Sequence, residues 1–312
     1  MRSGETGRAG GELPPAGPAT NGATSDAAGE RQLLAEPVTN PLESHAVSAD
    51  SPNKRSVATP VMSQTERLVG SGLTAAIALF LLFTPWPLME KMRTVGHACC
   101  AQIPSHTIRF AGQAMPLDAR NSGIYSAVFV TIAMGWLTGR RKGALFANSR
   151  VGLVLMLFVL AMMFDGFNSL AETHNLRTFY ADTNTLRIIT GTLAGTALTI
   201  LTLPLFSLLV WRDPEPVAIA DDFGELAGYL VAALVVILAL TKAPASLYYP
   251  MSILSIAGLL TTLTFVNTCI GIVSLRRRNT LGTLSSCVVP ALAGLLVTCF
   301  EIMAIDIWLA HH

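Results

Sequence analysis

Charged residues are scarce in this chain. Asp, Glu, Lys and Arg together make up 13% of the 312 residues, whereas soluble domains carry about 25%. Hydrophobic residues reach 51%, and this balance favours a protein that has lipid as its solvent. The formal net charge of +1 gives no electrostatic reason to expect nucleic acid or a strongly anionic partner. We therefore expect a membrane protein whose partner is the lipid bilayer and which does not bind nucleic acid.

Aromatic residues and apolar runs are absent from residues 1–66. This stretch is rich in Gly, Ala, Pro, Ser, Thr and Glu, so it cannot bury enough apolar surface to offset the entropy lost on ordering. Its beginning has no apolar stretch of the kind that a secretory signal peptide needs, and Glu5, Glu12, Asp26 and Glu30 speak against a transit peptide. We predict a disordered cytoplasmic tail over residues 1–66 and a transmembrane domain over residues 67–312.

Familiar catalytic and ligand-binding motifs are also lacking. The five cysteines show no metal-finger spacing. Three of them, Cys269, Cys287 and Cys299, lie in apolar runs, where Cys usually behaves as a small hydrophobic residue. The chain contains no Ser–His–Asp pattern, phosphate-binding glycine loop, HExxH or dinucleotide fingerprint. The sequence therefore predicts no cofactor, no bound metal and no catalytic residue.

Long apolar runs are what the sequence has in abundance. A transmembrane helix needs about 20 mainly apolar residues, and seven runs approach this length. They are Leu73–Met89, Gly123–Leu137, Val151–Leu170, Ile188–Trp211, Leu226–Leu240, Pro250–Leu275 and Leu281–Ala310. The sequence thus predicts an all-α, polytopic bundle of about seven transmembrane helices.

Basic residues in short loops indicate the orientation. Arg140, Arg141, Lys142 and Arg150 follow the second run, and Arg276, Arg277 and Arg278 follow the sixth. The loop 90–122 also holds Lys91, Arg93, Arg109 and Arg120, but these are spread over a longer segment. We expect a cell-membrane protein with its N-terminus in the cytoplasm and its C-terminus outside. Trp86, Trp136, Trp211 and Trp308 lie near the ends of the runs, as in an aromatic belt.

Two glycines in the fourth run predict a close contact between helices. Gly191 and Gly195 have the small-xxx-small spacing that lets two helix backbones approach. Packing within one chain is favoured over the formation of a homodimer. Association with other membrane subunits remains an alternative, and the sequence does not fix the oligomeric state.

Residues 99–125 carry a recognisable pattern. They begin with Cys99–Cys100–Ala101–Gln102 and end with Asp118–Ala119–Arg120–Asn121–Ser122–Gly123–Ile124–Tyr125, and further matches follow at Asp165–Gly166 and at Thr183–Gly191. Over residues ~70–211 the chain resembles the predicted bacterial membrane proteins of the family called "domain of unknown function 2085". The family pattern has Cys-His-Gln, then Gly-His, then Cys-x-Arg-Cys-Thr-Gly-Ile-Tyr. The resemblance implies a fold and a set of positions, and the family name carries no function.

Most of the family's Cys and His positions are occupied by other residues here. Cys100, Gln102, Arg120, Gly123 and Tyr125 are retained, whereas the two histidines correspond to Ala101 and Gln113 and the two later cysteines to Asp118 and Asn121. Cysteine and histidine at such spacing would suit a soft metal or a thiol redox pair. We therefore expect a degenerate polar site on the outer face, formed by Cys100, Gln102, His106 and Asp118.

Acidic residues within the apolar runs are the other candidates. Asp165 and Glu301 are placed where a charge is costly and often functional. We predict that Asp165 forms an ion pair with Arg187 across the third and fourth runs. The wider set of structural or relay candidates is Asp165, Arg187, Arg120, Asn184, Glu301 and Asp306. Since Asp306 lies about one and a half turns beyond Glu301, the two carboxylates face different sides of a helix.

Three classes of function follow from these observations. The first is a non-catalytic structural, interaction or assembly component of the membrane. The second is a transporter of a small solute, ion or proton that uses Asp165 and Glu301. The third is a membrane enzyme with a metal or redox-thiol site, which is disfavoured because most of the expected ligands are replaced.

Overall fold

A computed structural model describes residues 65, 68–72, 86–174, 176–276 and 278–311. The chain divides into two units, residues 1–56 and 57–312, and all described residues belong to the second. The predicted disordered tail therefore lies outside the described residues, except for residue 65. Of the predicted first span, Leu73–Met89, the structure describes only residues 86–89.

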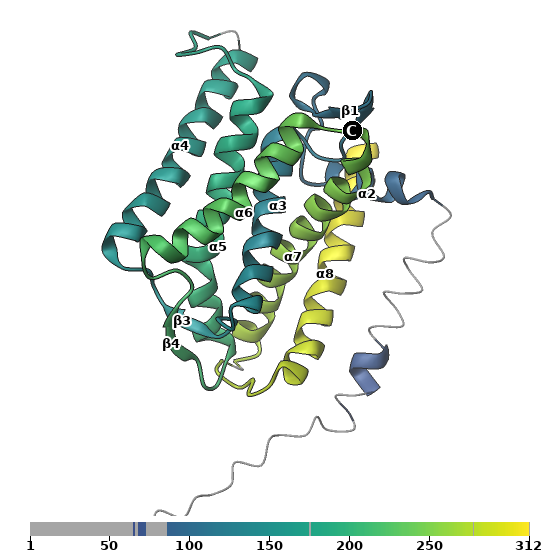
Figure 1. Ribbon diagram of the computed structural model, residues 1–312. Coiled ribbons are helices and arrows are strands. Elements are labelled where there is room, and N and C mark those ends of the chain that lie inside the picture. The colour runs from purple at the N-terminus through teal and green to yellow at the C-terminus, as the bar shows by residue number, and fades with distance from the viewer. Residues whose placement is uncertain (1–64, 66–67, 73–85, 175, 277, 312) are drawn as a thin grey trace, which may run out of the picture. The chain divides into compact units, whose positions relative to one another are not determined.

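Six long helices, of 19 to 27 residues, make up most of the described part of the second unit (Figure 1). They are α3 (Ala119–Leu137), α4 (Ser149–Thr173), α5 (Asn184–Val210), α6 (Phe223–Lys242), α7 (Tyr248–Ser274) and α8 (Leu284–Ala310). The helices from α4 to α8 are long and apolar enough to cross a membrane. Helix α3 begins with a polar turn, but it packs against α5, α6 and α7. The predicted all-α, multi-pass membrane fold is confirmed.

The helices begin two to four residues before most of the predicted runs, because polar residues cap their first turns. Asp118 Oδ1 accepts a hydrogen bond from the amide of Asn121, and Asn148 caps α4 in the same way. Thr183 and Asp222 cap α5 and α6. A side-chain oxygen at this position satisfies a backbone N–H that the helix leaves free. Hydropathy finds the apolar middle of each helix, and the caps determine where the helix starts.

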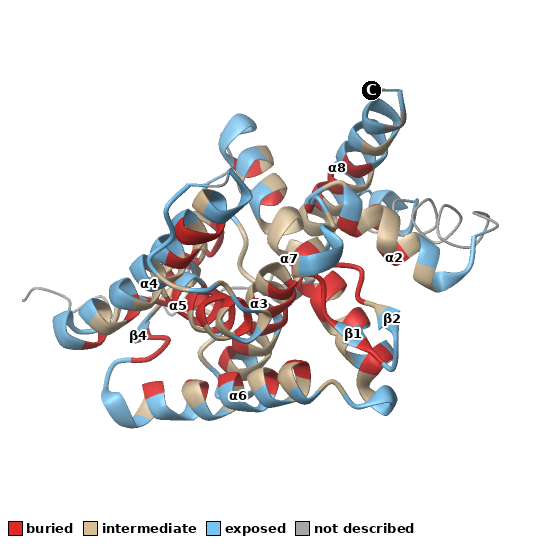
Figure 2. Ribbon diagram, turned by 90° about the horizontal axis from the view of Figure 1, so that it is seen from above, coloured by how far each residue is buried: buried red, intermediate tan, exposed pale blue. Residues whose placement is uncertain are grey.

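Helices α3 and α5 form the centre of the bundle. Helix α4 packs on α5, α7 packs on α3, and α8 packs on α7, while α6 contacts both α3 and α5. Figures 1 and 2 accordingly show α4 and α8 on opposite sides of the central pair. A Cβ at Gly191 would collide with the carbonyl oxygen of Arg120, and one at Gly195 with that of Ile124. The small-xxx-small motif is thus used for close packing of α5 on α3 within one chain, as predicted.

The loops 138–148, 211–222 and 275–283 meet at one end of the bundle, which we call the basic end. There β3 (Gly143–Leu145) pairs in parallel with β4 (Glu215–Ala218), and Gly143 lies opposite Glu215. Arg140 forms an ion pair with Glu225. Trp211 follows the last residue of α5, near the end of a run as expected, but its side chain is buried and so differs from a tryptophan of an aromatic belt. Lys142 Nζ lies over its ring, 5.2 Å from the ring centre.

The segment 88–118 lies at the opposite end, which we call the polar end. The sequence predicts a loop over residues 90–122, but the structure has α2 (Leu88–His97), a 3-10 turn η1 (Pro104–His106) and an antiparallel pair of β1 (Arg109–Phe110) and β2 (Gln113–Ala114) before α3 begins at Ala119. Phe110 and Leu117 are fully buried, and Tyr248 donates a hydrogen bond to the carbonyl oxygen of Ala114 (3.1 Å). The segment is therefore a packed part of the bundle.

Candidate polar site at one end of the bundle

Three of the family's five ligand positions come together in space. The thiol of Cys100 donates to Asp118 Oδ2 (3.1 Å), and the amide of Asp118 donates to the Cys100 sulfur (3.4 Å). Asn121 donates to Asp118 through its side-chain amide (3.3 Å) and its backbone amide (2.8 Å). The other two positions, Ala101 and Gln113, hold exposed residues. Asp118 therefore joins the loop that carries Cys100 to the first turn of α3.

Gln102 fixes the same loop from the other side. Its side-chain amide donates to the carbonyl oxygens of Arg93 (2.9 Å) and Pro116 (2.8 Å). These bonds connect α2 with the residues just before α3. The backbone of Gln102 adopts a positive φ of 50°, which is uncommon for a residue other than glycine. The retained glutamine is thus used to fasten the segment 88–118 to the bundle.

The pKa values of two thiols and one imidazole in this loop are shifted in the direction that favours the neutral form. Burial raises the pKa of the Cys100 thiol, and the adjacent Asp118 carboxylate raises it further. Burial also raises the pKa of Cys99. The pKa of His106 is lowered, first by burial and then by the charge of Arg187. A neutral thiol is a poor nucleophile and a poor metal ligand, so this loop is not arranged for thiolate chemistry.

Asp165 is the centre of a buried network between α3, α4 and α5. Its Oδ2 accepts hydrogen bonds from Arg120 Nη2 (2.7 Å) and Thr190 Oγ1 (3.1 Å), and its Oδ1 accepts one from Tyr180 OH (2.9 Å). Only 1% of the residue is exposed. Burial and the hydrogen bond to Asp165 raise the pKa of Tyr180 to about 12. The predicted ion pair between Asp165 and Arg187 is wrong, because the Asp165 carboxylate forms its ion pair with Arg120 of α3.

Arg187 pairs with a different carboxylate, that of Asp182. It also donates to Asn184 Oδ1 (2.9 Å), and Asn184 in turn donates to the carbonyl oxygen of Ser105 (3.0 Å) in the segment 88–118. Ser169 links the two ion pairs. Its hydroxyl oxygen accepts hydrogen bonds from Arg120 Nη2 (2.8 Å) and from Arg187 Nε (3.3 Å). The same hydroxyl group donates a hydrogen bond to Asp182 Oδ2.

This network balances its own charge. Arg120 pairs with Asp165, and Arg187 pairs with Asp182. Hydroxyl groups of Tyr180, Thr190 and Ser169 donate further hydrogen bonds to the two carboxylates. Among the described residues, Asp182 Oδ1 is the buried carboxylate oxygen of this network that has no hydrogen-bond partner. A buried network of ion pairs and hydrogen bonds rigidifies the elements that it connects. Asn168 extends it, since its side chain accepts from the amide of Phe179 (2.8 Å) and donates to the carbonyl oxygen of Tyr180 (3.1 Å). Asp165 and Asn168, two polar residues within the third apolar run, thus hold the loop between α4 and α5.

Glu301 and Asp306 lie away from this network, on α8. Asp306 faces His97 of α2, with 3.5 Å between its Oδ1 and the imidazole Nδ1. Glu301 Oε2 accepts a hydrogen bond from the amide of Asn267 on α7 (2.8 Å), and the same amide donates to Thr298 (2.9 Å). Since α4 and α8 lie on opposite sides of the α3–α5 pair (Figure 2), the structure does not bring Asp165 and Glu301 together.

Several residues of these clusters are not distinctive in the sequence. Ser169, Tyr180, Thr190 and Asn267 are hydroxyl or amide side chains, and residues of these types occur throughout the apolar runs. The only signal for Ser169 in the sequence is its spacing of four residues from Asp165, which places both residues on the same face of a helix. Nothing in the spacing indicates that Arg120, far away along the chain, reaches α4.

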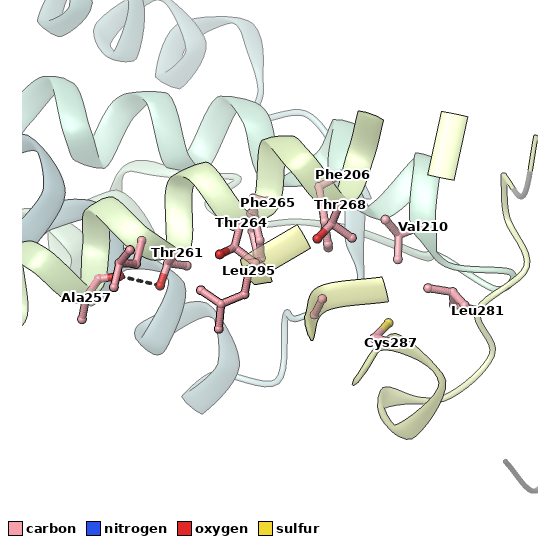
Figure 3. Close-up of a pocket in the computed structure, with 12 residues that line it drawn as sticks. Phe206, Val210, Ala257, Thr261, Thr264, Phe265, Thr268, Leu281, Cys287 and Leu295 are labelled. Atoms are coloured by element: carbon pink, nitrogen blue, oxygen red, sulfur yellow. Dashed lines mark hydrogen bonds between the residues drawn. The ribbon is translucent and has the colours of Figure 1, made fainter. Parts of the chain in front are cut away.

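Apolar crevices are present between the long helices. One, of about 650 Å³, lies between α3, α5 and α7, and another, of about 380 Å³, lies between α5, α7 and α8. Figure 3 shows the second crevice, where Phe206, Phe265 and Leu295 surround the hydroxyls of Thr264 and Thr268. Such linings suit hydrocarbon chains better than a polar substrate. Within the described residues, no group of three or more His, Cys, Asp or Glu side chains could hold a metal ion.

The fold and the site together define a multi-pass helical membrane protein with a closed polar network at one end. Comparison with known families agrees with this class: residues 100–201 match the family described as "Predicted membrane protein (DUF2085)". The resemblance seen in the sequence is therefore confirmed for this part of the chain. No curated protein and no solved structure matches the chain.

Proposed function

We propose that this chain is a non-catalytic structural or assembly component of the membrane, in which the degenerate site fastens the helices. The observation that supports this role most directly is the position of Asp118. It stands where the family pattern has a cysteine, and here it caps α3 and accepts the thiol proton of Cys100. A residue with these two hydrogen bonds stabilises the fold and leaves no thiolate pair for a soft metal or for redox chemistry.

Metal content and stability of the purified full-length protein test this proposal. We expect no stoichiometric transition metal, and we expect Asp118→Ala to lower the free energy of unfolding by about 1 kcal/mol, the usual value of a helix cap. Asp118→Asn keeps a capping oxygen and should lose less. A metal content near one ion per chain that disappears in Cys100→Ala would overturn the proposal in favour of a membrane enzyme.

Proton or ion transport is the second candidate, and the placement of Glu301 is what favours it. This carboxyl group lies on an apolar transmembrane helix and is exposed, whereas Asp165 is enclosed by an arginine and two hydroxyls. Dissipation of a pH gradient in proteoliposomes would test this function. Transport that is lost in Glu301→Gln but kept in Asp165→Asn would support it, and equal rates in protein-containing and empty liposomes would exclude it.

A further inference from the structure

Glu301 lies deep in the region that the bilayer occupies. Its Cα is about 25 Å from the start of α8, and Asn267 is about 10 Å from the end of α7, at 1.5 Å per residue. The two helices run antiparallel and are joined by the short loop 275–283. Side chains lean toward the start of their helix, so Glu301 and Asn267 reach toward each other. When a hydrocarbon core about 30 Å thick is centred on α7 and α8, these distances place the carboxyl group that bonds Asn267 in the middle part of the core.

The groups around this carboxyl group are neutral. Asn267 provides one amide hydrogen bond, and Thr298 shares the same amide. Thr261, Thr264 and Thr268 follow along α7, lining the crevice in Figure 3. Within the part of the chain that the structure describes, Glu301 belongs to none of the ion pairs.

Among the described residues, no charged group on α2, α7 or α8 forms an ion pair with Glu301. Helix α7 has no acidic or basic residue from Tyr248 to Ser274, and its other titratable groups are Tyr248, Tyr249 and Cys269. Helix α2 provides Glu90, Lys91, Arg93 and His97, of which Arg93 pairs with Glu90, His97 faces Asp306, and Lys91 lines a crevice with Asp306. On α8 itself the remaining titratable groups are Cys287, Cys299, Asp306 and His311.

We propose that Glu301 is a proton-binding site inside the bilayer, with its carboxyl group protonated while the exposed α7–α8 face lies against lipid. A carboxylate without a counterion is strongly disfavoured in hydrocarbon, and most of this cost is removed when the group takes up a proton. The protonated group still accepts from Asn267 and gains a donor of its own. Release of the proton then requires water or a basic partner at this face. This inference is independent of the structural role proposed for the polar end.

A hydrophobic carbodiimide tests the protonation state directly. Dicyclohexylcarbodiimide adds to a protonated carboxyl group: the carboxyl proton moves to one nitrogen, and the acyl group ends on the other as a stable N-acylurea. We expect the full-length protein in liposomes of neutral phospholipid to be labelled at Glu301, as shown by peptide mapping. Above the pH of half-labelling the yield should fall about tenfold per pH unit, because the protonated fraction falls by that factor.

Three variants complete the experiment. Glu301→Gln should remove the label, while Glu172→Gln, a matched change of an exposed acid at the end of α4, should leave it unchanged. Asn267→Ala removes a donor that stabilises the ionised form, so the pH of half-labelling should rise. The proposal is overturned if Glu301 stays unlabelled by the hydrophobic reagent at pH 6, or if a water-soluble carbodiimide labels it as readily as Glu172. Both outcomes are read on the unmodified chain and do not depend on the folding of a variant.

Discussion

At the scale of single residues, the polar end is built from carboxylates that each serve more than one neighbour. Asp165 joins α3, α4 and the loop before α5, and Asp118 joins the segment 88–118 to α3. A buried carboxylate is stable only when its lone pairs are filled and its charge is balanced. Asp165 meets both conditions through Arg120, Thr190 and Tyr180, so these residues should behave as a coupled unit.

Removing either partner of the Asp165–Arg120 pair should destabilise the protein strongly. We expect Asp165→Asn and Arg120→Gln each to cost about 3–5 kcal/mol, because each leaves an uncompensated buried charge. The double variant should recover more than about 1 kcal/mol of the summed loss. Thermal or denaturant unfolding in detergent measures this coupling.

The matched comparison is the pair Asp165 and Arg187, which among the described contacts form no ion pair with each other and are linked through Arg120 and Ser169. Their coupling should be clearly smaller than that of Asp165 with Arg120. A larger coupling would mean that the ion pair drawn from the sequence forms in the membrane after all. Strict additivity for Asp165 and Arg120 would remove the structural role of the network.

Cys100 should react slowly with alkylating agents. Burial and the Asp118 carboxylate raise the pKa of this thiol above the ordinary value of 9.0, so little thiolate is present near pH 8. Mass spectrometry of timed alkylation with iodoacetamide should show Cys100 reacting more slowly than the exposed Cys99. Asp118→Asn should accelerate Cys100 without changing Cys99. Equal rates for the two thiols in the folded protein would contradict this.

The same shift predicts a loss of stability in alkali. The folded protein holds the Cys100 proton more tightly than the unfolded chain does. Its contribution is therefore fully present below pH 9.0, the ordinary value, and is lost as the pH rises through the higher folded pKa. Melting temperatures measured from pH 8 to pH 10 should decline less steeply for Cys100→Ala than for the unmodified chain.

At the scale of elements, the close approach of α5 to α3 sets the geometry of the centre. Gly191 and Gly195 place their backbones against the carbonyl groups of Arg120 and Ile124. Since α4 also packs on α5, the close approach of α3 to α5 brings Arg120 within reach of Asp165 on α4. The packing motif and the buried ion pair are therefore connected.

Adding one methyl group at this contact should be costly. We expect Gly191→Ala and Gly195→Ala each to lower the free energy of unfolding by about 1–3 kcal/mol, since the rigid backbone of α3 cannot move aside without cost. Gly152→Ala on α4 is a matched control, because its Cβ meets no atom within 4 Å. That variant should be neutral or slightly stabilising. Equal effects at all three positions would show that the contact is not tight.

The sequence predicts the elements better than it predicts their contacts. Six apolar runs correspond to α3–α8, and the largest errors at helix starts arise from caps such as Asp118 and Thr183. The sequence predicts a loop over residues 90–122, since the short elements of this stretch have no sustained periodicity. Nearness along the chain favours Arg187 as the partner of Asp165, whereas three-dimensional packing brings in Arg120. Pairing across a bundle depends on which helices are neighbours, and hydropathy does not contain that information.

At the scale of the whole second unit, the two ends of the bundle differ in their loops. The basic end has short loops with Arg140, Arg141, Lys142, Arg212, Arg276 and Arg278, and the polar end has the long segment 88–118. Basic residues in short loops favour the cytoplasmic side. We propose on this ground that the basic end is cytoplasmic and that the segment 88–118 and the C-terminus are outside.

Accessibility of introduced cysteines tests this orientation. In a chain whose own cysteines are replaced by serine, Arg141→Cys places a thiol at the exposed basic end, and Gln113→Cys places one on the exposed hairpin at the polar end. A membrane-impermeant maleimide applied to intact cells should label position 113 and spare position 141. After the membrane is permeabilised, both should react, which controls for thiols that are merely unreactive. Labelling of position 141 alone in intact cells would reverse the topology. It would also place the Asp165 network, which lies at the same end as position 113, on the cytoplasmic side, while Glu301 would stay at its depth in the bilayer.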